Sequence, residues 1–521
     1  MKFWTVILSF FLFSIGFVEA QKLKPIRLEV PGNLKAETYQ VVPVDNQGVI
    51  VFYESSSIEE NKRIWFFALL DTKLQQKWLK KVPLSDNLIF VKSAKTKKKV
   101  YFLFKNFAKT GKDYDYYEVV VFDRIDHHFL SLSGSIPLHV TIKDFKVIGD
   151  KGCMALNKKG FEADLAFLDL TTGEIKPVHL DDESGAMVES LYADGKKNRF
   201  YVVCKYYNKT TFFKDAVISF DVSGKKVHKM ISEYPNNLRL PRNHRFVKIS
   251  SDEVDLVGTY DLITGRRPDW KDVTGDDHQE AMTAGFFYLK FKAGKQVSLK
   301  FYDFMKFGNI HYAVQGNQVM MTKKGKGQTE KETKNKKVNI YYHVNHPLVT
   351  PMGNETVFSV ELYKPYYVVE TRMDYDFYGR MYPYTYEVFG GYEFYDVIFA
   401  GFDASGTMKW NNDFPISDLL TYSLENHTVL VTDDPLITLA YVTKGELVSQ
   451  TFEKSKDIGE REKIKIETVF KKDRVVEDEN NQIVHWYDDY FLVFGYQRIK
   501  NRALEDKSNR TVFFINKVAF K

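Results

Sequence analysis

One stretch of this 521-residue chain gathers side chains suited to recognition or to acid–base chemistry. Between residues 363 and 395 stand ten of the 32 tyrosines, interleaved with arginine and aspartate. Tyrosine offers a flat apolar ring and a hydroxyl, a combination enriched at binding surfaces and suited to stacking on sugars or peptides. The predicted ligand-binding residues are Arg372, Asp374, Tyr375, Asp376, Tyr378, Arg380, Tyr382 and Tyr384.

The sequence leaves more than one interpretation of this stretch open. Residues 374–384 lack a regular strand pattern, so we interpret residues 363–395 as a long inserted loop, and such loops are usually functional in a compact fold. The alternative interpretation is that the tyrosine rings only pack the loop against the sheet that carries it. A carboxylate pair such as Asp374 and Asp376 could also serve acid–base catalysis, provided that their separation and pKa values were fixed.

Other combinations of reactive residues are weaker. His343 and His346 stand three apart, but no Glu or Cys completes a metal-binding set, and a structural role is favoured. The polar run at residues 276–278 contains two aspartates and a histidine that could touch a cation. No nucleophile elbow, phosphate loop or dinucleotide fingerprint is present. We therefore expect no catalytic residue, no metal site and no cofactor.

Strands must position these residues. Apolar runs of four to eight residues, rich in β-branched and aromatic side chains, recur along the chain between polar clusters, as at residues 48–53, 100–104, 117–122 and 200–203. No convincing amphipathic helix interrupts them. The chain is predicted to be all-β.

A hairpin signature repeats at near-constant spacing. An apolar strand ends in Asp, a polar turn often containing Gly follows, and a second strand leaves; Asp suits this turn because its carboxylate bonds backbone amides two residues on. The markers Asp71, Asp123, Asp169 and Asp221 lie 52, 46 and 52 residues apart. Later markers are Ala293-Gly294, Asp403, Lys444-Gly445 and Asp506-Lys507.

A period near 50 with about four strands predicts a β-propeller of seven or eight four-stranded blades, with long loop insertions at about 320–338 and 363–395. The lone strand at residues 26–30 is expected to complete the last blade, beside residues 511–518. The alternative is two stacked β-sandwich domains. Cys153 and Cys204 lie 51 residues apart, so we expect them at equivalent positions as buried free thiols rather than as a disulfide.

Two hairpins carry a family resemblance. Residues 167–174 (FLDLTTGE) and 402–410 (FDASGTMKW) resemble the repeat of quinoprotein-like propellers, and the chain is similar in style to WD-repeat-like exported propellers of Gram-negative bacteria. The resemblance implies the architecture. Quinone-dependent members of that family pair vicinal cysteines with calcium, whereas no Cys-Cys pair occurs here, so no quinone cofactor is expected.

The remaining signals concern location and partners. Residues 1–20 have a short basic start, an apolar run and small residues before Gln21, which predicts a cleaved signal peptide and an exported chain, periplasmic, outer-envelope associated or secreted. No later stretch is long and apolar enough for a transmembrane helix, so membrane association is expected to be peripheral at most. Residues 320–338 hold seven lysines and are expected to be a solvated loop.

Composition excludes some functions. The net charge of +6 over this length is too small to argue for nucleic acid as a partner. Because no catalytic set stands out, we predict a non-enzymatic scaffold that binds a protein or glycan ligand at the cell envelope. The alternative is a secreted glycan-active hydrolase that uses the Tyr- and Asp-rich segment at 363–395.

Overall fold

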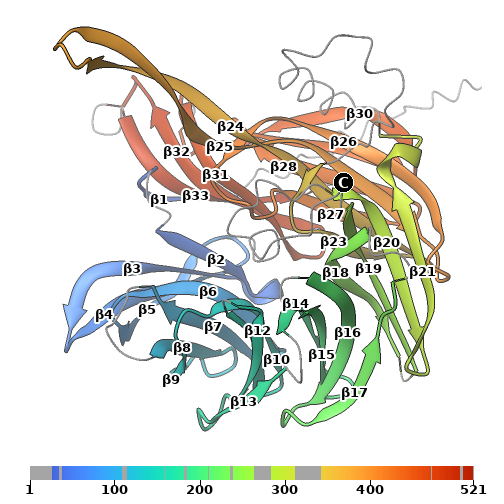
Figure 1. The fold of residues 1–521 in the computed structure, drawn as a ribbon. Helices are drawn as coiled ribbons and strands as arrows, with labels where there is room; N and C mark the ends of the chain where they lie inside the picture. Colours follow the sequence, from blue (N-terminus) through green and yellow to red (C-terminus); the bar gives the residue numbers. More distant parts are fainter. Residues whose placement is uncertain are drawn as a thin grey trace, which may run out of the picture.

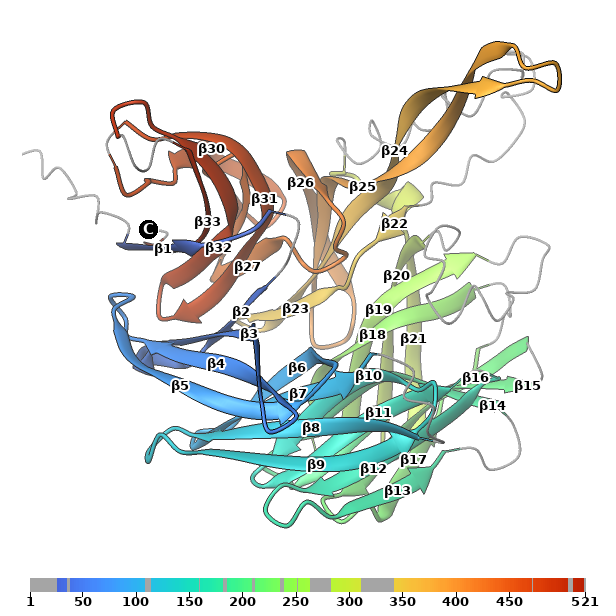
Figure 2. The same ribbon diagram turned by 90° about the vertical axis from the view of Figure 1, so that its left-hand side faces the viewer.

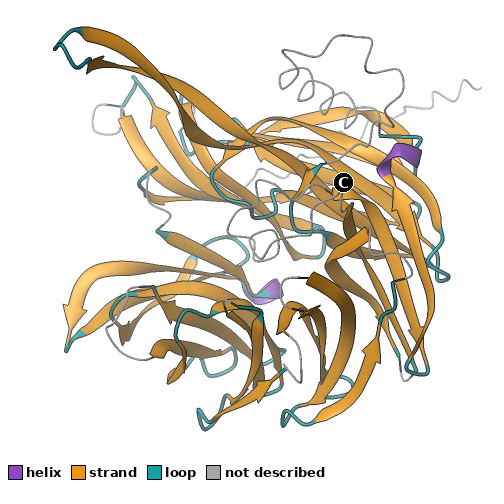
Figure 3. Ribbon diagram, in the orientation of Figure 1, coloured by secondary structure: helices purple, strands orange, loops and turns teal. Residues whose placement is uncertain are grey.

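The computed structural model of the chain consists almost entirely of strands (Figure 3). It describes residues 26–34, 38–107, 114–158, 160–180, 185–208, 211–234, 239–250, 252–262, 283–310, 342–470, 472–504 and 509–519. Apart from strands, these ranges contain two short 3₁₀ turns, η1 (Asp45–Gln47) and η2 (Phe304–Lys306). The expected signal peptide, the lysine-rich segment at 320–338 and the run at 276–278 lie outside the described residues.

The described strands form eight antiparallel sheets, which we number as blades in chain order. Blade 1 contains β2 (Tyr39–Pro43), β3 (Val49–Glu59), β4 (Lys62–Leu70) and β5 (Gln76–Ser85). Blade 2 contains β6 (Leu88–Lys95), β7 (Lys99–Asn106), β8 (Tyr114–Asp123) and β9 (Phe129–Pro137). Blade 3 contains β10 (Thr141–Ile148), β11 (Lys151–Lys158), β12 (Glu162–Asp169) and β13 (Ile175–His179). Blade 4 contains β14 (Gly185–Asp194), β15 (Arg199–Asn208), β16 (Thr211–Asp221) and β17 (Lys226–Ile231).

The second half of the chain continues the pattern. Blade 5 contains β18 (Arg239–Ile249), β19 (Glu253–Leu262), β20 (Thr283–Lys292) and β21 (Lys295–Asp303). Blade 6 has five strands, β22 (His343–Val344), β23 (Leu348–Met352), β24 (Glu355–Tyr375), β25 (Met381–Phe402) and β26 (Met408–Thr421). Blade 7 contains β27 (Thr428–Asp433), β28 (Leu436–Thr443), β29 (Glu446–Glu453) and β30 (Lys456–Lys465). Blade 8 contains β31 (Arg474–Tyr487), β32 (Tyr490–Lys500), β33 (Asn509–Ala519) and β1 (Ile26–Pro31).

Eight apolar clusters close the blades into a ring. Each cluster joins two successive blades, from blades 1 and 2 round to blades 8 and 1. From blade 2 to blade 8 an inner strand of each blade contacts one of the next, and β31 of blade 8 contacts η1 of blade 1. In Figure 1 the colours run from blue through green to red and return beside the blue sheet. The fold is therefore an eight-bladed β-propeller, which confirms the prediction and excludes two stacked sandwiches.

The N-terminal strand seals the ring. β1 pairs antiparallel with β33, with Ile26 opposite Lys517, and so forms the outermost strand of blade 8. At the same junction the Trp486 indole donates a 2.8 Å hydrogen bond to the Gly48 carbonyl of blade 1, and Tyr39 stacks on Phe513. The predicted closure by the termini is confirmed, and it covers an edge that β33 would otherwise expose.

The repeat markers have a common structural origin. Asp71, Asp123, Asp169 and Asp221 all stand at the hairpin between the third and fourth strands of their blades, where the Oδ1 atom accepts backbone N–H bonds two residues on. Asp403 and Ala293-Gly294 occupy the same hairpin in blades 6 and 5. Lys444-Gly445 instead joins the second and third strands of blade 7, so this marker was wrong, and Asp506-Lys507 lies outside the described residues.

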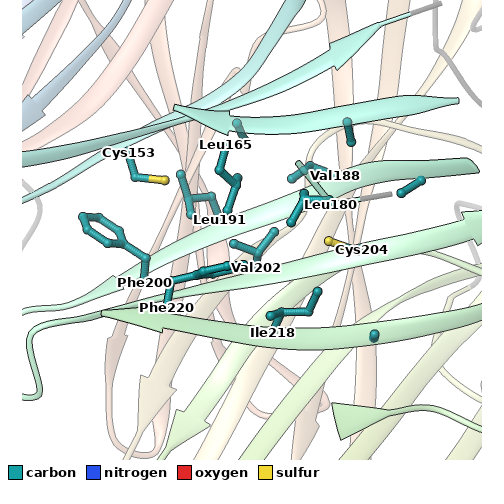
Figure 4. Packing of buried hydrophobic residues seen from close by; sticks show 14 of the residues in the cluster. Cys153, Leu165, Leu180, Val188, Leu191, Phe200, Val202, Cys204, Ile218 and Phe220 are labelled. Carbon is teal, nitrogen blue, oxygen red and sulfur yellow. The ribbon is translucent and has the colours of Figure 1, made fainter. Parts of the chain in front are cut away.

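Both cysteines are free and buried, as predicted. Cys153 lies on β11 and Cys204 on β15, the second strands of their blades, and both belong to the cluster between blades 3 and 4 (Figure 4). Burial raises the pKa of the Cys153 thiol well above its usual value. These thiols therefore serve as small core side chains.

Candidate functional site

The segment at 363–395 is a β-hairpin and not the loop expected from its sequence. β24 and β25 run side by side over 21 and 22 residues, and beyond the blade they project as a two-stranded ribbon (Figure 2). We call residues 366–391 the arm. Residues 369–375 alternate between charged and uncharged side chains, which is a strand pattern that the loop interpretation did not take into account.

β-Bulges at the base mark where the arm leaves the blade. The pairing of β24 with β25 shifts between Tyr366 and Tyr367, where Gly390 is the extra residue. A Cβ at Gly390 would lie 2.9 Å from the Tyr366 ring and from a Val368 methyl, so a larger residue would have to displace these side chains. Bulges bend a strand and increase its local twist, which redirects the ribbon away from the propeller body.

One face of the arm carries a column of tyrosines opposite a row of charges. Tyr382, Tyr384 and Tyr386 of β25 pair across the ribbon with Asp374, Arg372 and Glu370 of β24. These six residues share a face because side chains at i and i+2 point the same way, and we call it the tyrosine face.

The contacts on the tyrosine face hold the rings in place. The Arg372 guanidinium lies 5.6 Å from the centroid of Tyr384 and 5.7 Å from that of Tyr386, and the two rings stack 6.0 Å apart. The Tyr386 hydroxyl donates a 3.0 Å hydrogen bond to Glu370, whose carboxylate raises the pKa of that hydroxyl. The result is a flat array of aromatic rings with charged groups beside it.

The tip of the arm uses the same turn as the blades. The Asp376 carboxylate accepts the backbone N–H groups of Tyr378 at 2.9 Å and Arg380 at 2.8 Å, and Gly379 takes a φ of +75°. This turn presents Phe377 and Tyr378, which are 98% and 81% exposed. Large aromatic side chains so exposed are typical of binding surfaces.

The structure brings together part of the predicted site. Arg372, Asp374, Tyr382 and Tyr384 lie on the tyrosine face, while Tyr375 lies on the opposite face and the remaining three form the tip, namely Asp376, Tyr378 and Arg380. Sequence reasoning left out Glu370, Tyr386 and Phe377. The spacing of two residues from Tyr382 to Tyr386 would have identified the column, had this stretch been recognised as a strand.

A second candidate site lies between blades 2 and 3. A pocket of about 350 Å³ is lined mostly by apolar side chains, with a polar end at which the Asp164 carboxylate contacts His179 Nδ1 at 2.5 Å and Lys158 Nζ at 2.6 Å. Apolar walls with a few polar groups are typical of small-ligand sites. No residue of the predicted set lines this pocket.

Bulges in the inner strands gather a third group of charges. The extra residues are Lys143 in β10, Glu189 in β14 and the Asn243-His244 pair in β18. The Asn243 N–H donates a 2.6 Å bond to Glu189. Burial alone would raise the pKa of Glu189. The electrostatic effects of Lys205, Lys143 and His244, given from the largest to the smallest, outweigh burial and lower the pKa to about 2. Bulges leave no signal in the sequence, so this group was not predicted.

We expect Glu189→Gln to destabilise the fold at neutral pH. Because the pKa of Glu189 falls from 4.5 to about 2 on folding, its charge stabilises the protein above about pH 4.5, and this contribution is lost as the pH falls toward 2. The expected loss of unfolding free energy at pH 7 is up to about 3 kcal/mol. Urea unfolding of the wild-type chain and of Glu189→Gln should show a difference in unfolding free energy that narrows below about pH 4.5. Equal unfolding free energies at pH 7 would contradict a stabilising charge on Glu189.

The two histidines considered as a weak metal-binding pair differ in burial, since His346 is exposed and His343 is packed. His343 is 4% exposed on β22 and stacks on Tyr363 at 5.6 Å. In the described part of the chain no group of three or more His, Cys, Asp or Glu could hold a metal ion. No helix among the described residues is long and apolar enough to cross a membrane.

Comparison with known proteins finds no matching family model and no matching curated protein. Among solved structures, the chain is similar to the β-propeller domain of the Trilobed protease from Pyrococcus furiosus, at 10% identity and a TM-score of 0.34 over 82% of this chain and 98% of that one. It is similar to the polysaccharide lyase Uly1 at 9% identity and a TM-score of 0.38, over 93% and 100%. It is similar to a prolyl endopeptidase at 10% identity and a TM-score of 0.36, over 90% and 54%.

These likenesses are distant and carry no argument about activity. The propeller architecture rests on the eight sheets of the chain itself and on the eight clusters between them. The narrower resemblance to quinoprotein-like or WD-repeat-like propellers has no support from a family model. The class of protein is thus an eight-bladed propeller that carries a projecting aromatic arm.

Proposed function

We propose that this chain is an exported, non-enzymatic propeller that binds a protein or glycan partner at the cell envelope through the arm. One observation carries the proposal: eleven large apolar side chains of the arm are between 41% and 98% exposed, namely Tyr366, Tyr367, Val368, Val369, Met373, Tyr375, Phe377, Tyr378, Met381, Tyr382 and Tyr384. Contiguous exposed apolar surface of this kind marks interaction sites in soluble proteins.

The shape of the arm supports the same proposal. An isolated two-stranded hairpin is at best marginally stable in water, so a ribbon that projects from its sheet gains stability when a partner covers it. The arm departs from blade 6, whose core residues Phe394 and Val397 are 1% exposed, so its base is rigidly held. Binding residues are often carried on connecting segments that a rigid scaffold positions.

Export is part of the proposal and rests on residues 1–20. Their short basic start, apolar run and small residues before Gln21 are the features that a signal peptidase reads. A partner at the cell envelope, either protein or polysaccharide, would meet an exported chain.

The geometry of the arm gives little support to the alternative function, glycan hydrolysis. Asp374 lies on the exposed tyrosine face, and the Asp376 carboxylate is occupied by two backbone N–H groups of its own turn. A carboxylic acid must be shielded from water to act as a general acid near neutral pH. The exposed ribbon does not shield these two groups, so we favour binding over turnover.

Binding and turnover can be separated directly. We would probe the purified chain on an array of envelope polysaccharides and on an array of extended peptides, and follow the release of reducing ends from every glycan that is captured. The proposal expects capture of at least one class without release. Release of reducing ends at a catalytic rate would favour the hydrolase.

A further inference from the structure

The turn at the tip determines which backbone groups of the arm point outward. Asp376 N–H donates to the Arg380 carbonyl at 2.9 Å, so these two residues form a hydrogen-bonded pair. Such pairs alternate along an antiparallel ladder with pairs whose N–H and C=O groups point away from the ribbon. The outward pairs are therefore Tyr375–Met381, Met373–Pro383, Thr371–Thr385, Val369–Glu387 and Tyr367–Phe389.

The two edges of the arm differ in their capacity to accept another strand. On β25 an outward position is held by Pro383, which has no N–H, so this edge is interrupted in the way that natural sheets block edge pairing. On β24 every outward residue from Tyr367 to Tyr375 keeps its N–H. Among the described strands, β22 and β23 pair with β24 no further than Tyr363, so this edge is open along the arm.

The charges on β24 make this edge complementary to itself. We propose that two copies of the chain pair through the outer edge of β24, antiparallel, about a two-fold axis at Thr371. This register sets Glu370 of each copy opposite Arg372 of the other. It also sets Val369 opposite Met373, and Tyr367 opposite Tyr375. Opposite charges and apolar or aromatic pairs facing each other are what stabilise antiparallel strands.

Other registers are less favourable. Outward groups meet outward groups whenever the two-fold axis passes through a residue, so Val369, Glu370, Thr371, Arg372 and Met373 are the candidate centres within the run from Tyr367 to Tyr375. A centre at Glu370 sets two glutamates opposite each other, and a centre at Val369 pairs only five residues of that run. A centre at Arg372 sets two arginines opposite each other and Glu370 opposite Asp374, which is repulsive. A centre at Met373 lies only two residues from the end of β24 at Tyr375. It therefore pairs five residues of each strand, whereas the centre at Thr371 pairs nine.

The proposed pairing is compatible with the rest of the molecule. Because the arm projects from the body, antiparallel arms place the two propellers at opposite ends of a four-stranded ribbon (Figure 2). The contact uses backbone groups at the β24 edge, so it does not depend on what the tyrosine column of β25 binds. A closed two-fold dimer also leaves no further copy of this edge open.

Proline substitution tests the edge. Thr371 and Thr385 stand opposite each other at outward positions, so proline at either one removes an outward N–H but no backbone bond within the arm. Either substitution also removes the 3.4 Å contact between the two threonine hydroxyls, so the two variants are matched in this respect. Thr371→Pro removes two donors from the centre of the dimer and should weaken association in sedimentation velocity by about 30-fold, while the matched control Thr385→Pro should leave it unchanged. A wild-type chain that stays monomeric up to its solubility limit would overturn the proposal, as would equal effects of the two prolines.

Charge exchange tests the register. Glu370→Arg or Arg372→Glu alone places like charges opposite each other and should weaken the dimer, whereas the double variant restores opposite charges and should restore it. A Thr371→Cys chain should form one disulfide between copies, since Cα atoms of a directly opposed pair are about 5.5 Å apart. Cys153 and Cys204 are buried and should stay unreactive. Absence of both the rescue and the cross-link would overturn the register at Thr371.

Discussion

A chain that begins at residue 32 will unfold at a markedly lower urea concentration than one that begins at residue 25. The shorter chain lacks β1, whose Ile26, Leu28 and Val30 side chains are half-buried against the cluster between blades 8 and 1. Losing three half-buried aliphatic side chains costs roughly 3 kcal/mol.

The charged residues of β1 add to this effect. The Arg27 guanidinium donates 2.9 Å bonds to Asn516 and to Gln497, which are 0% and 1% exposed. Glu29 accepts from Arg510 at 3.1 Å. Without β1 the two buried amides lose a donor, at roughly 1 kcal/mol each, so the total loss of unfolding free energy is roughly 5 kcal/mol.

The chain that begins at residue 25 is the matched control, because it differs only by the strand in question. Light scattering should in addition show aggregation of the shorter chain, since β33 becomes an open edge. Equal urea midpoints and equal solubility of the two chains would contradict closure of the ring by β1.

The second large effect is expected on binding. Replacing Tyr378, Tyr382 and Tyr384 together by alanine should weaken capture of the polysaccharide or peptide found on the arrays by 30-fold or more, because central aromatic residues of an interface contribute about 2 kcal/mol or more. The three side chains are 81%, 42% and 45% exposed. Exposed substitutions usually change stability by less than about 0.5 kcal/mol each, so the urea midpoint should move little.

A control with similar exposure lies on the blades. Ile58, Leu130 and Tyr192 are 55%, 44% and 41% exposed, on blades 1, 2 and 4. Their joint replacement by alanine should leave capture unchanged. If the arm tyrosines instead packed a core, the triple variant would lose about 3 to 5 kcal/mol for each ring, and a large fall in the urea midpoint would refute the assignment of the site.

The blades were predictable because their signal is local. The carboxylates of Asp71, Asp123, Asp169 and Asp221 bond the backbone of their own turns, and apolar runs rich in β-branched and aromatic residues mark the strands that precede them. Blade 7 lacks an Asp at this hairpin, and Lys444-Gly445, the predicted marker, turns between the second and third strands instead. A marker based on glycine alone does not identify which hairpin it closes.

The arm could be predicted in composition but not in form. Tyrosine, arginine and aspartate between residues 363 and 395 indicated a recognition surface. The alternation of charged and uncharged residues at 369–375 is a strand pattern, but the irregular residues of the turn that follow it favoured a loop. Strands of 21 and 22 residues also exceed the usual range of 3 to 10. Which tyrosines of β25 lie beside Arg372 and Asp374 depends on the register between the two strands, which no local sequence signal specifies.

Shortening the arm tests most directly whether it is the recognition element on a rigid frame. Val368 and Val388 form a hydrogen-bonded pair by the alternation described above, so an Asn-Gly turn in place of residues 369–387 can close the hairpin there. The contact of Tyr367 with Phe389 at the base is kept. We predict that the shortened chain keeps the urea midpoint of the full chain and no longer captures the polysaccharide or peptide. Undiminished capture by a folded, shortened chain would contradict it.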